Sequence, residues 1–384
     1  MNPRLYIDVH ILQTVPPANL NRDDQGNPKE AYFGGVRRSR VSSQAWKRAT
    51  RMAFAGRLPE EKLATRTKKI ASQLTERLEA RTDLDPAAAA RIAGALLLAT
   101  LDIRAGKKAG DTAYLLFYGR QQLEEIVNLV VDQLDELAVL DDVDLAAAVK
   151  EFPVREKLGA GHPMDVALFG RMVAEIPSLN VDAATQVAHA LSTHATELEF
   201  DYYTAVDDEN AKEETGAGMI GTIGFNSATL YRYATVSLHQ LTANLGEDTA
   251  AAFDAVELFL HSFARSAPSG YGNSFAHRTL PSLVAVVVRR DQPVNLVSAF
   301  ENPVRARNGI VAVSARRLAR EHILATSQWG DTPLHTGLCH TFDPDDEETS
   351  ATAAALSTAF CPAQPFPTLL AKLRASLIET VKQG

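Results

Sequence analysis

The chain of 384 residues is 46% hydrophobic and 22% charged, with a net charge of −8, which is typical of a soluble globular protein. Its two cysteines, Cys339 and Cys361, are too few for a disulfide framework and fit a reducing compartment. No stretch reaches the about 20 apolar residues of a membrane span. Asp8 and His10 interrupt the first apolar stretch, which argues against a signal peptide. We therefore expect a cytoplasmic protein with no membrane partner.

The first predicted element is a β-strand. Apolar and polar residues alternate from Leu5 to Ile11, which is the period of a half-buried strand. A polar loop follows from Pro16 to Glu30, and it contains Arg22.

The segment from Tyr32 to Arg57 carries seven basic side chains and no acidic one. In a chain of net charge −8 this is a local cationic patch, and its expected partner is a polyanion. The basic residues are Arg37, Arg38, Arg40, Lys47, Arg48, Arg51 and Arg57.

A helix is predicted inside this segment, starting near Ala45, with Ser42 or Ser43 as its N-cap. The free N–H groups at such a helix start favour phosphate binding. A solvated basic helix face would show the same pattern, but the absence of Glu partners four residues away favours a binding role. The basic residues that can share a face are Lys47, Arg48 and Arg51, and the residues that can pack inward are Trp46, Ala49, Met52 and Ala53.

From Pro59 to about Ala195 the chain is rich in Ala, Leu, Glu and Arg with helical spacing. This block is interpreted as a helical insertion into a domain that contains strands. Helices are expected around Ile70 to Leu78 and at about 86–105, 120–140, 165–176 and 181–195.

Strands return after a polar, Gly-rich segment from Asp201 to Gly224, which is interpreted as a protruding arm. Strands are predicted at Ala228–Leu238 and at Ser282–Arg290, which is a near-continuous apolar run. The fold class is therefore α+β, a sandwich with a large helical insertion. Further helices are expected at about 249–266, 314–326 and 367–382.

Charge is unevenly distributed along the chain. Between Arg265 and Arg320 there are nine basic residues and only two acidic ones, Asp291 and Glu301. In contrast, residues 132–151 contain seven acidic residues and one lysine. A fold that brought the first basic segment next to the second would form one positive groove.

Signals for catalysis or metal binding are weak. Gly216, Gly218 and Gly221 match G-x-G-x-x-G, but they follow a polar segment and precede a strand, which is the wrong context for a dinucleotide site. A metal site is not expected. His335, Cys339 and His340 could be ligands, but zinc sites normally have a pair of Cys or His residues at each end, and Cys361 stands alone. His10 and His277 could serve as general acid and base of a metal-free ribonuclease, although nothing in the sequence brings them together.

Several blocks in order along the chain resemble the CasC (Cse-type) backbone subunit of the type I-E CRISPR Cascade complex. The blocks run from residue 5 to about 240, and the likeness is weaker beyond. They include Asn21-Arg22-Asp23-Asp24, Phe33-Gly34-Gly35-Val36-Arg37-Arg38-Ser39-Arg40-Val41-Ser42-Ser43-Gln44, Asp165-Val166-Ala167-Leu168-Phe169-Gly170-Arg171-Met172, Tyr203-Thr204-Ala205-Val206-Asp207-Asp208 and Tyr231-Arg232-Tyr233-Ala234.

The resemblance implies a hand-shaped protein with a ferredoxin-like (RRM-like) palm, helical fingers and a thumb. The palm would be formed by residues 1–58 and 225–384, the fingers by 59–195 and the thumb by 196–224. In such subunits several copies assemble along a CRISPR RNA, and the thumb of one copy covers the RNA on the palm of the next.

The resemblance also implies which residues contact RNA. Two features depart from the expected pattern: the thumb tip carries five acids between Asp207 and Glu214, and the sheet lacks the aromatic signature of ordinary RNA-recognition motifs. The implied contacts are Arg22, Arg38, Ser42, Ser43, Gln44, Lys47, Arg48 and Arg51, and the implied base-separating wedges are Met172, Tyr203, Thr204 and Val206.

We therefore expect a non-enzymatic subunit, with no cofactor and no metal, that presents guide bases for pairing with target DNA. Its expected partners are CRISPR RNA, target DNA, other copies of itself and other Cascade subunits. The alternatives are an endoribonuclease that processes precursor RNA through His10 or His277, and an RNA chaperone that binds as a monomer.

Overall fold

The computed structural model describes residues 4–101, 106–108, 111–205, 219–307, 309–347 and 349–383. The chain forms two compact units. Unit 1 comprises residues 1–53, 186–237 and 256–384, and unit 2 comprises residues 54–185 and 238–255. No helix in the described part of the chain is long and apolar enough to cross a membrane.

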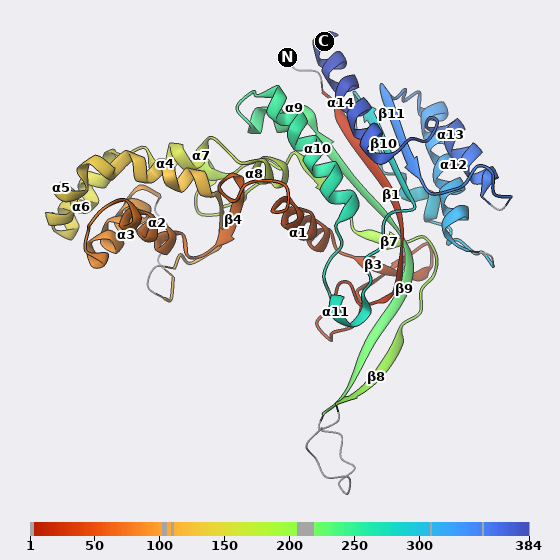
Figure 1. Cartoon of the computed structure of the whole chain (residues 1–384), viewed down its shortest axis with the longest axis horizontal. Helices are drawn as coiled ribbons and strands as arrows, with labels where there is room; N and C mark the ends of the chain where they lie inside the picture. Colours follow the sequence, from red (N-terminus) through yellow and green to blue (C-terminus); the bar gives the residue numbers. More distant parts are fainter. Residues whose placement is uncertain are drawn as a thin grey trace, which may run out of the picture. The chain divides into compact units, whose positions relative to one another are not determined.

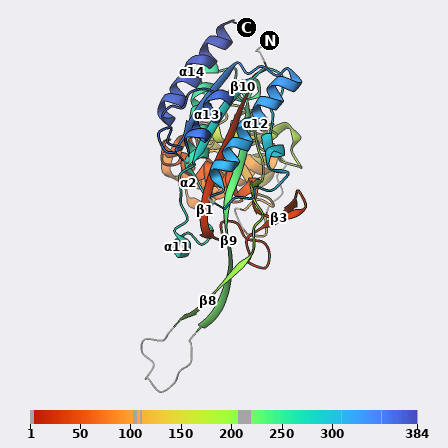
Figure 2. The same cartoon turned by 90° about the vertical axis from the view of Figure 1, so that its right-hand side faces the viewer.

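The core of unit 1 is an antiparallel sheet built around its first strand. β1 (Tyr6–Ala18) lies between β9 (Met219–Ser237) and β10 (Leu283–Arg289), and it runs antiparallel to both (Figure 2). β11 (His335–His340) extends the sheet beyond β10. On the other side the order continues from β9 to β7 (Ala190–Ser192), β3 (Val36–Val41) and β2 (Glu30–Phe33), while β6 (Thr185–Val187) and β8 (Glu199–Ala205) also pair with β9.

Helices cover both faces of this sheet. Figure 1 shows α10 (Thr249–Arg265) on one side of β1, β9 and β10, with α12 (Val311–Trp329) and α13 (Ser350–Ala359) on the other. α14 (Phe366–Gln383) completes the unit together with the short helices α1 (Ser43–Phe54), α11 (Gly272–Phe275) and η5 (Leu296–Phe300). The predicted strands at 228–238 and 282–290 and the helices at 249–266, 314–326 and 367–382 are confirmed.

The expectation that β1 is half-buried is wrong, because Asp8, His10 and Gln13 are buried as fully as its apolar residues. The Asp8 carboxylate accepts hydrogen bonds from Arg289 Nε at 3.0 Å, Tyr233 Oη at 2.9 Å and the Val294 amide at 2.9 Å. His10 Nδ1 lies 2.9 Å from Tyr231 Oη. Partners supplied by neighbouring strands therefore allow polar residues on a second buried face.

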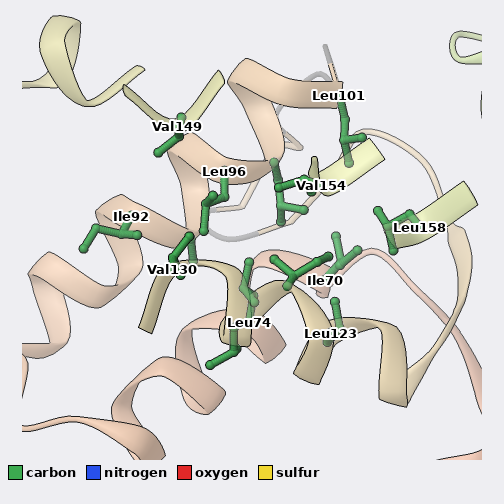
Figure 3. Packing of buried hydrophobic residues seen from close by; sticks show 14 of the residues in the cluster. Ile70, Leu74, Ile92, Leu96, Leu101, Leu123, Val130, Val149, Val154 and Leu158 are labelled. Atoms are coloured by element: carbon green, nitrogen blue, oxygen red, sulfur yellow. The ribbon is translucent and has the colours of Figure 1, made fainter. Parts of the chain in front are cut away.

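Unit 2 is mainly helical and has its own apolar core. Figure 3 shows how Ile70, Leu96, Leu123 and Val154 from different helices meet in this core. β4 (Ala64–Thr67) and β5 (Leu116–Gly119) form a separate two-stranded antiparallel sheet. The elements are η1 (Glu60–Lys62), α2 (Ile70–Arg81), α3 (Pro86–Leu101), α4 (Arg120–Val130), η2 (Val131–Gln133), α5 (Leu134–Val139), α6 (Asp142–Ala148), η3 (Val149–Glu151), α7 (Val154–Gly159), α8 (Met164–Phe169), η4 (Pro177–Leu179) and α9 (Leu238–Asn244).

Two predicted helices are wrong. The one at 165–176 ends as α8 at Phe169, because Gly170 adopts a φ of 73° and its Cα lies too close to the Val181 carbonyl for a side chain. The one at 181–195 consists of the short strands β6 and β7, whose pairing partners β9 and β3 are distant in the sequence. The predicted 120–140 helix is interrupted between α4 and α5.

Candidate nucleic-acid interface

The basic segment forms a strand followed by a capped helix. Ser42 Oγ accepts a hydrogen bond from the Ala45 amide at 3.4 Å, so Ser42 caps α1 as predicted. The Ser43 amide donates to His189 Nδ1 at 3.3 Å. Burial and the nearby Arg40 charge lower the pKa of His189, which keeps the imidazole neutral and able to accept this bond. The first turn of α1 contains no acidic residue.

α1 is anchored by a buried arginine from β9. The Arg232 guanidinium carbon lies 3.7 Å from the centre of the Trp46 ring and 4.5 Å from that of Phe263. Arg232 also donates to Gln13 Oε1 at 2.6 Å and to the Phe263 carbonyl. Burial lowers the pKa of Arg232 to about 9, so the group is still charged at neutral pH. Cation–π contacts between desolvated groups contribute about 2 kcal/mol. The contact with Arg232 therefore holds Trp46, and with it the buried face of α1, in place.

Beside α1 lies a cavity of about 900 Å³, which we call the cleft. Three segments line it: the loop 20–26, one face of α1, and the stretch 265–271 together with Arg278. Met52 belongs to this cleft and is 55% exposed, so the prediction that it packs inward is wrong. The charged residues of the cleft are Arg22, Arg48, Arg265 and Arg278, with Asp23 and Asp24.

The cleft confirms part of the predicted positive groove. Arg265 and Arg278 come from the second basic region and line the same cavity as Arg22 and Arg48. All four of these arginines are exposed. A cavity with four arginines and two aspartates favours an anionic ligand.

The second candidate surface is the arm, which we define as β8 paired with residues 219–225 of β9. It projects from the sheet of unit 1 (Figure 1). Phe200, Tyr202 and Thr204 share one face of this ribbon, and Tyr203 points to the opposite face. Phe200 and Tyr202 are 60% and 62% exposed, which leaves an aromatic surface open to solvent.

Tyr203 lies directly over a glycine of the neighbouring strand. It pairs with Gly221, and a side chain on Gly221 would overlap the Tyr203 ring. Gly221 is therefore a strand residue rather than part of a phosphate-binding loop, while Gly216, Gly218 and Val206 lie outside the described residues.

Comparison with protein families shows the family of the chain. Residues 7–360 match the family model described as CT1975-like protein, a family of Cas proteins. The chain belongs to this family.

Solved structures agree with this assignment. A chain of a structure titled "CRISPR RNA-guided surveillance complex, pre-nicking" is 31% identical to this CT1975-like protein, with a TM-score of 0.81, over 97% of this chain and 99% of the other. A chain of a second "CRISPR RNA-guided surveillance complex" is 28% identical, with a TM-score of 0.73 and the same coverage. A comparison with curated proteins gives no match.

In this CT1975-like protein, most of the predicted RNA contacts cluster around α1. Ser42 is buried and serves as the cap, whereas Ser43, Lys47 and Arg51 are half-buried. Gln44, Arg48 and Arg22 are exposed, and the last two line the cleft. Sequence reasoning did not single out Tyr271, which lines the cleft as well.

The structure does not support Arg38 as a phosphate contact, because its side chain is fully buried. Its guanidinium donates to the backbone carbonyls of Phe33 at 3.1 Å, Ser192 at 2.9 Å and Phe300 at 2.8 Å. Arg38 therefore holds the β2–β3 hairpin against η5.

Met172, from unit 2, is 85% exposed and does not pack in a core. The preceding residue explains its position: Arg171 is buried and donates to the carbonyls of Leu179 at 2.6 Å and Leu158 at 2.8 Å. The chain is thus fixed on one side of Met172 while the methionine side chain extends into solvent.

The histidines considered for catalysis are buried. His10 has no exposed surface, and burial holds its pKa well below 6.5. His277 is 3% exposed and its Nε2 lies 2.9 Å from the Pro268 carbonyl. Among the described residues, no group of three or more His, Cys, Asp or Glu is arranged to hold a metal ion.

Proposed function

We propose that this protein is a non-enzymatic CRISPR RNA-binding subunit of the CasC type, which assembles along the guide RNA as the backbone of a type I-E Cascade complex. The observation that carries the proposal is the capped basic helix α1 beside the arginine-lined cleft, in a chain whose family and relatives are those of CRISPR surveillance complexes. The RNA would lie on unit 1.

The proposed hand shape has support in the connectivity of unit 1. β9 and β10 flank β1, both antiparallel to it, and α10 connects them in the chain. This is consistent with the ferredoxin-like palm, with unit 2 as the fingers and the arm as the thumb.

The chemistry of the surface supports binding that is independent of sequence. Arginine, lysine and helix N–H groups contact phosphates without distinguishing bases. Met172, Tyr203 and Val206, together with the methyl group of Thr204, would separate bases by stacking or wedging. Bases held in this way are available for pairing with target DNA, so pairing carries the specificity.

Two buried histidines support the non-enzymatic assignment over the endoribonuclease alternative. A general acid or base must come within hydrogen-bond reach of the reacting group. Neither His10 nor His277 presents its ring to solvent in the folded chain.

The proposal is tested by co-expression with a CRISPR array, followed by purification and sizing of the bound RNA. We expect RNA transcribed from the array to co-purify with the wild-type protein, and the isolated chain to leave that RNA uncut because the proposed subunit is non-enzymatic. The double variant Arg290→Glu with Arg320→Glu changes two exposed arginines outside the cleft and should still retain the RNA. Heterogeneous cellular RNA, or none, would contradict the proposal.

A further inference from the structure

Part of the cleft is lined by residues that were not among the predicted RNA contacts. Ala45, Arg48, Ala49 and Met52 line it from α1, and their spacing of three and four residues places them on one side of the helix. Lys47 and Arg51 lie on another side. Another part of the lining comes from residues 265–271 and Arg278, which belong to the segment that we call the loop 265–278 and that includes the short helix α11. Its contribution to binding is separable from that of Lys47 and Arg51.

The charges of the cleft favour an anion even with its aspartates counted. Asp23 Oδ1 accepts hydrogen bonds from the backbone amides of Gln25 and Asn27, both at 2.9 Å, so this carboxylate is engaged in its own turn. Asp24 is exposed at the edge of the same loop. Arg265, Arg278 and Tyr271 line the same cavity.

The backbone of the loop 265–278 is held in an unusual conformation. Tyr271 and Ala276 adopt left-handed φ values of 47° and 45°, which are costly for residues with side chains. Gly270 lies so close to the loop after β1 that a Cβ would be 2.5 Å from the carbonyl oxygens of Asn19 and Leu20. Such strain persists only where surrounding contacts fix the chain, so this segment is held in a defined conformation.

Tyr271 also fixes the position of Arg22. The Arg22 guanidinium carbon stands 4.9 Å from the centre of the Tyr271 ring. The Tyr271 ring meets Phe275 edge-on at 6.3 Å, and Phe275 lies 6.0 Å from Phe225 of β9. This series of rings connects the arginine to the sheet.

We propose that the loop 265–278 is the second wall of a binding cleft for single-stranded RNA, in which Arg265 and Arg278 hold phosphodiester groups and Tyr271 positions Arg22. The inference rests on the proposed function and assigns it further residues. A cavity of about 900 Å³ is large enough to hold a short stretch of one strand.

The test compares Arg265→Ala with Arg278→Ala, as a double variant, against Arg290→Ala with Arg320→Ala as the matched control. Binding of the full chain to two unrelated single-stranded RNAs and to duplex DNA is measured over a range of salt concentrations. Each lost phosphate contact lowers the magnitude of the log–log salt slope by about 0.7, so we expect a decrease of about 1.4 for RNA. The control should keep the wild-type slope.

The positioning role of Tyr271 is tested separately. Tyr271→Phe keeps the ring and should retain wild-type RNA affinity, whereas Tyr271→Leu should weaken binding about as much as Arg22→Ala. The double variant Tyr271→Leu with Arg22→Ala should bind no more weakly than Arg22→Ala alone. Thermal unfolding of each variant shows whether the chain remains folded. Equal losses for Tyr271→Phe and Tyr271→Leu would overturn this role.

The outcomes separate the inference from the proposed function. Wild-type protein that binds no RNA refutes the proposed function. RNA binding that is lost on changing Lys47 and Arg51, but unchanged in the Arg265 and Arg278 variant, refutes only the second wall. Loss of duplex DNA affinity with unchanged RNA affinity in that variant would show that the cleft serves a duplex and would overturn the inference as well.

Discussion

Lys47 and Arg51 differ from the other basic residues in their position on α1. Both are half-buried, and they lie away from the cleft side that carries Arg48. Trp46, which Arg232 holds in place, fixes the helix between these two sides. A phosphate bound by Lys47 and Arg51 is therefore bound independently of the cleft.

The change Lys47→Glu with Arg51→Glu should weaken binding to unrelated RNA sequences by a similar factor, because phosphates are common to all of them. If both residues hold phosphates, the magnitude of the salt slope should fall by about 1.4. Salt titrations with two RNAs of different sequence measure this. An unchanged slope would show that this side of α1 faces only solvent.

The sequence predicted the helix start, the cap and most of the basic residues of the interface, because these signals are local. It could not show that Arg38 is buried, since the carbonyls of Ser192 and Phe300 that bind it are distant in the chain. It did not single out Tyr271 either, because no sequence pattern indicates a tyrosine that has a left-handed backbone conformation and a ring in contact with an arginine.

At the scale of elements, the arm depends on a pairing of a large and a small residue across its two strands. The Tyr203 ring covers Gly221, and Thr222 lies on the opposite face beside Tyr202. A branched side chain at 221 would displace the ring, whereas a change at 222 would not.

Gly221→Val should therefore impair cooperative assembly on a long RNA and leave binding to a short oligonucleotide nearly unchanged. The matched control is Thr222→Val, which keeps a β-branched residue on the other face of the same strand. Analytical ultracentrifugation on RNAs of two lengths measures both quantities. Equal behaviour of the two variants would show that the Tyr203 ring position has no role in assembly.

The sequence predicted best the helices in which apolar spacing continues over several turns. It predicted worst the short strands whose pairing partners are distant in the sequence. α10, α12 and α14 each carry several turns of apolar spacing, and their positions follow from the sequence. β6 and β7 have three residues each and exist through their partners in the sheet. A three-residue strand carries too little pattern to compete with a helical interpretation.

The whole molecule contains buried histidines that affect its stability. Burial, with the charge of Arg289 as a second cause, lowers the pKa of His322 to about 4. The His322 ring is stacked on Phe360 with centres 4.3 Å apart. The unfolded chain binds a proton here near pH 6.5 and the folded chain does not, so acid favours unfolding.

The free energy of unfolding should therefore decrease as the pH falls from about 6.5 towards 4, by up to about 1.4 kcal/mol per pH unit for His322. Urea titrations at several pH values measure this dependence. His322→Gln should reduce the slope in this range, because one titrating group is removed. A variant with the wild-type slope would show that His322 titrates normally in the folded protein.

Assembly along RNA is the central claim, and it depends on the arm. Residues 207–218 carry five acids, and alanine is the only apolar residue type among them, so deleting them should leave each copy folded. The proposed phosphate contacts at α1 and in the cleft lie elsewhere in the chain and should still bind a single copy to short RNA.

The most direct measurement is nuclease footprinting on a long RNA with the intact protein and with the protein lacking 207–218. We expect protection that repeats every few nucleotides with the intact chain, and loss of this repeat and of cooperativity in the shortened one. An identical periodic footprint from both proteins, or no periodicity from the intact one, would contradict this expectation.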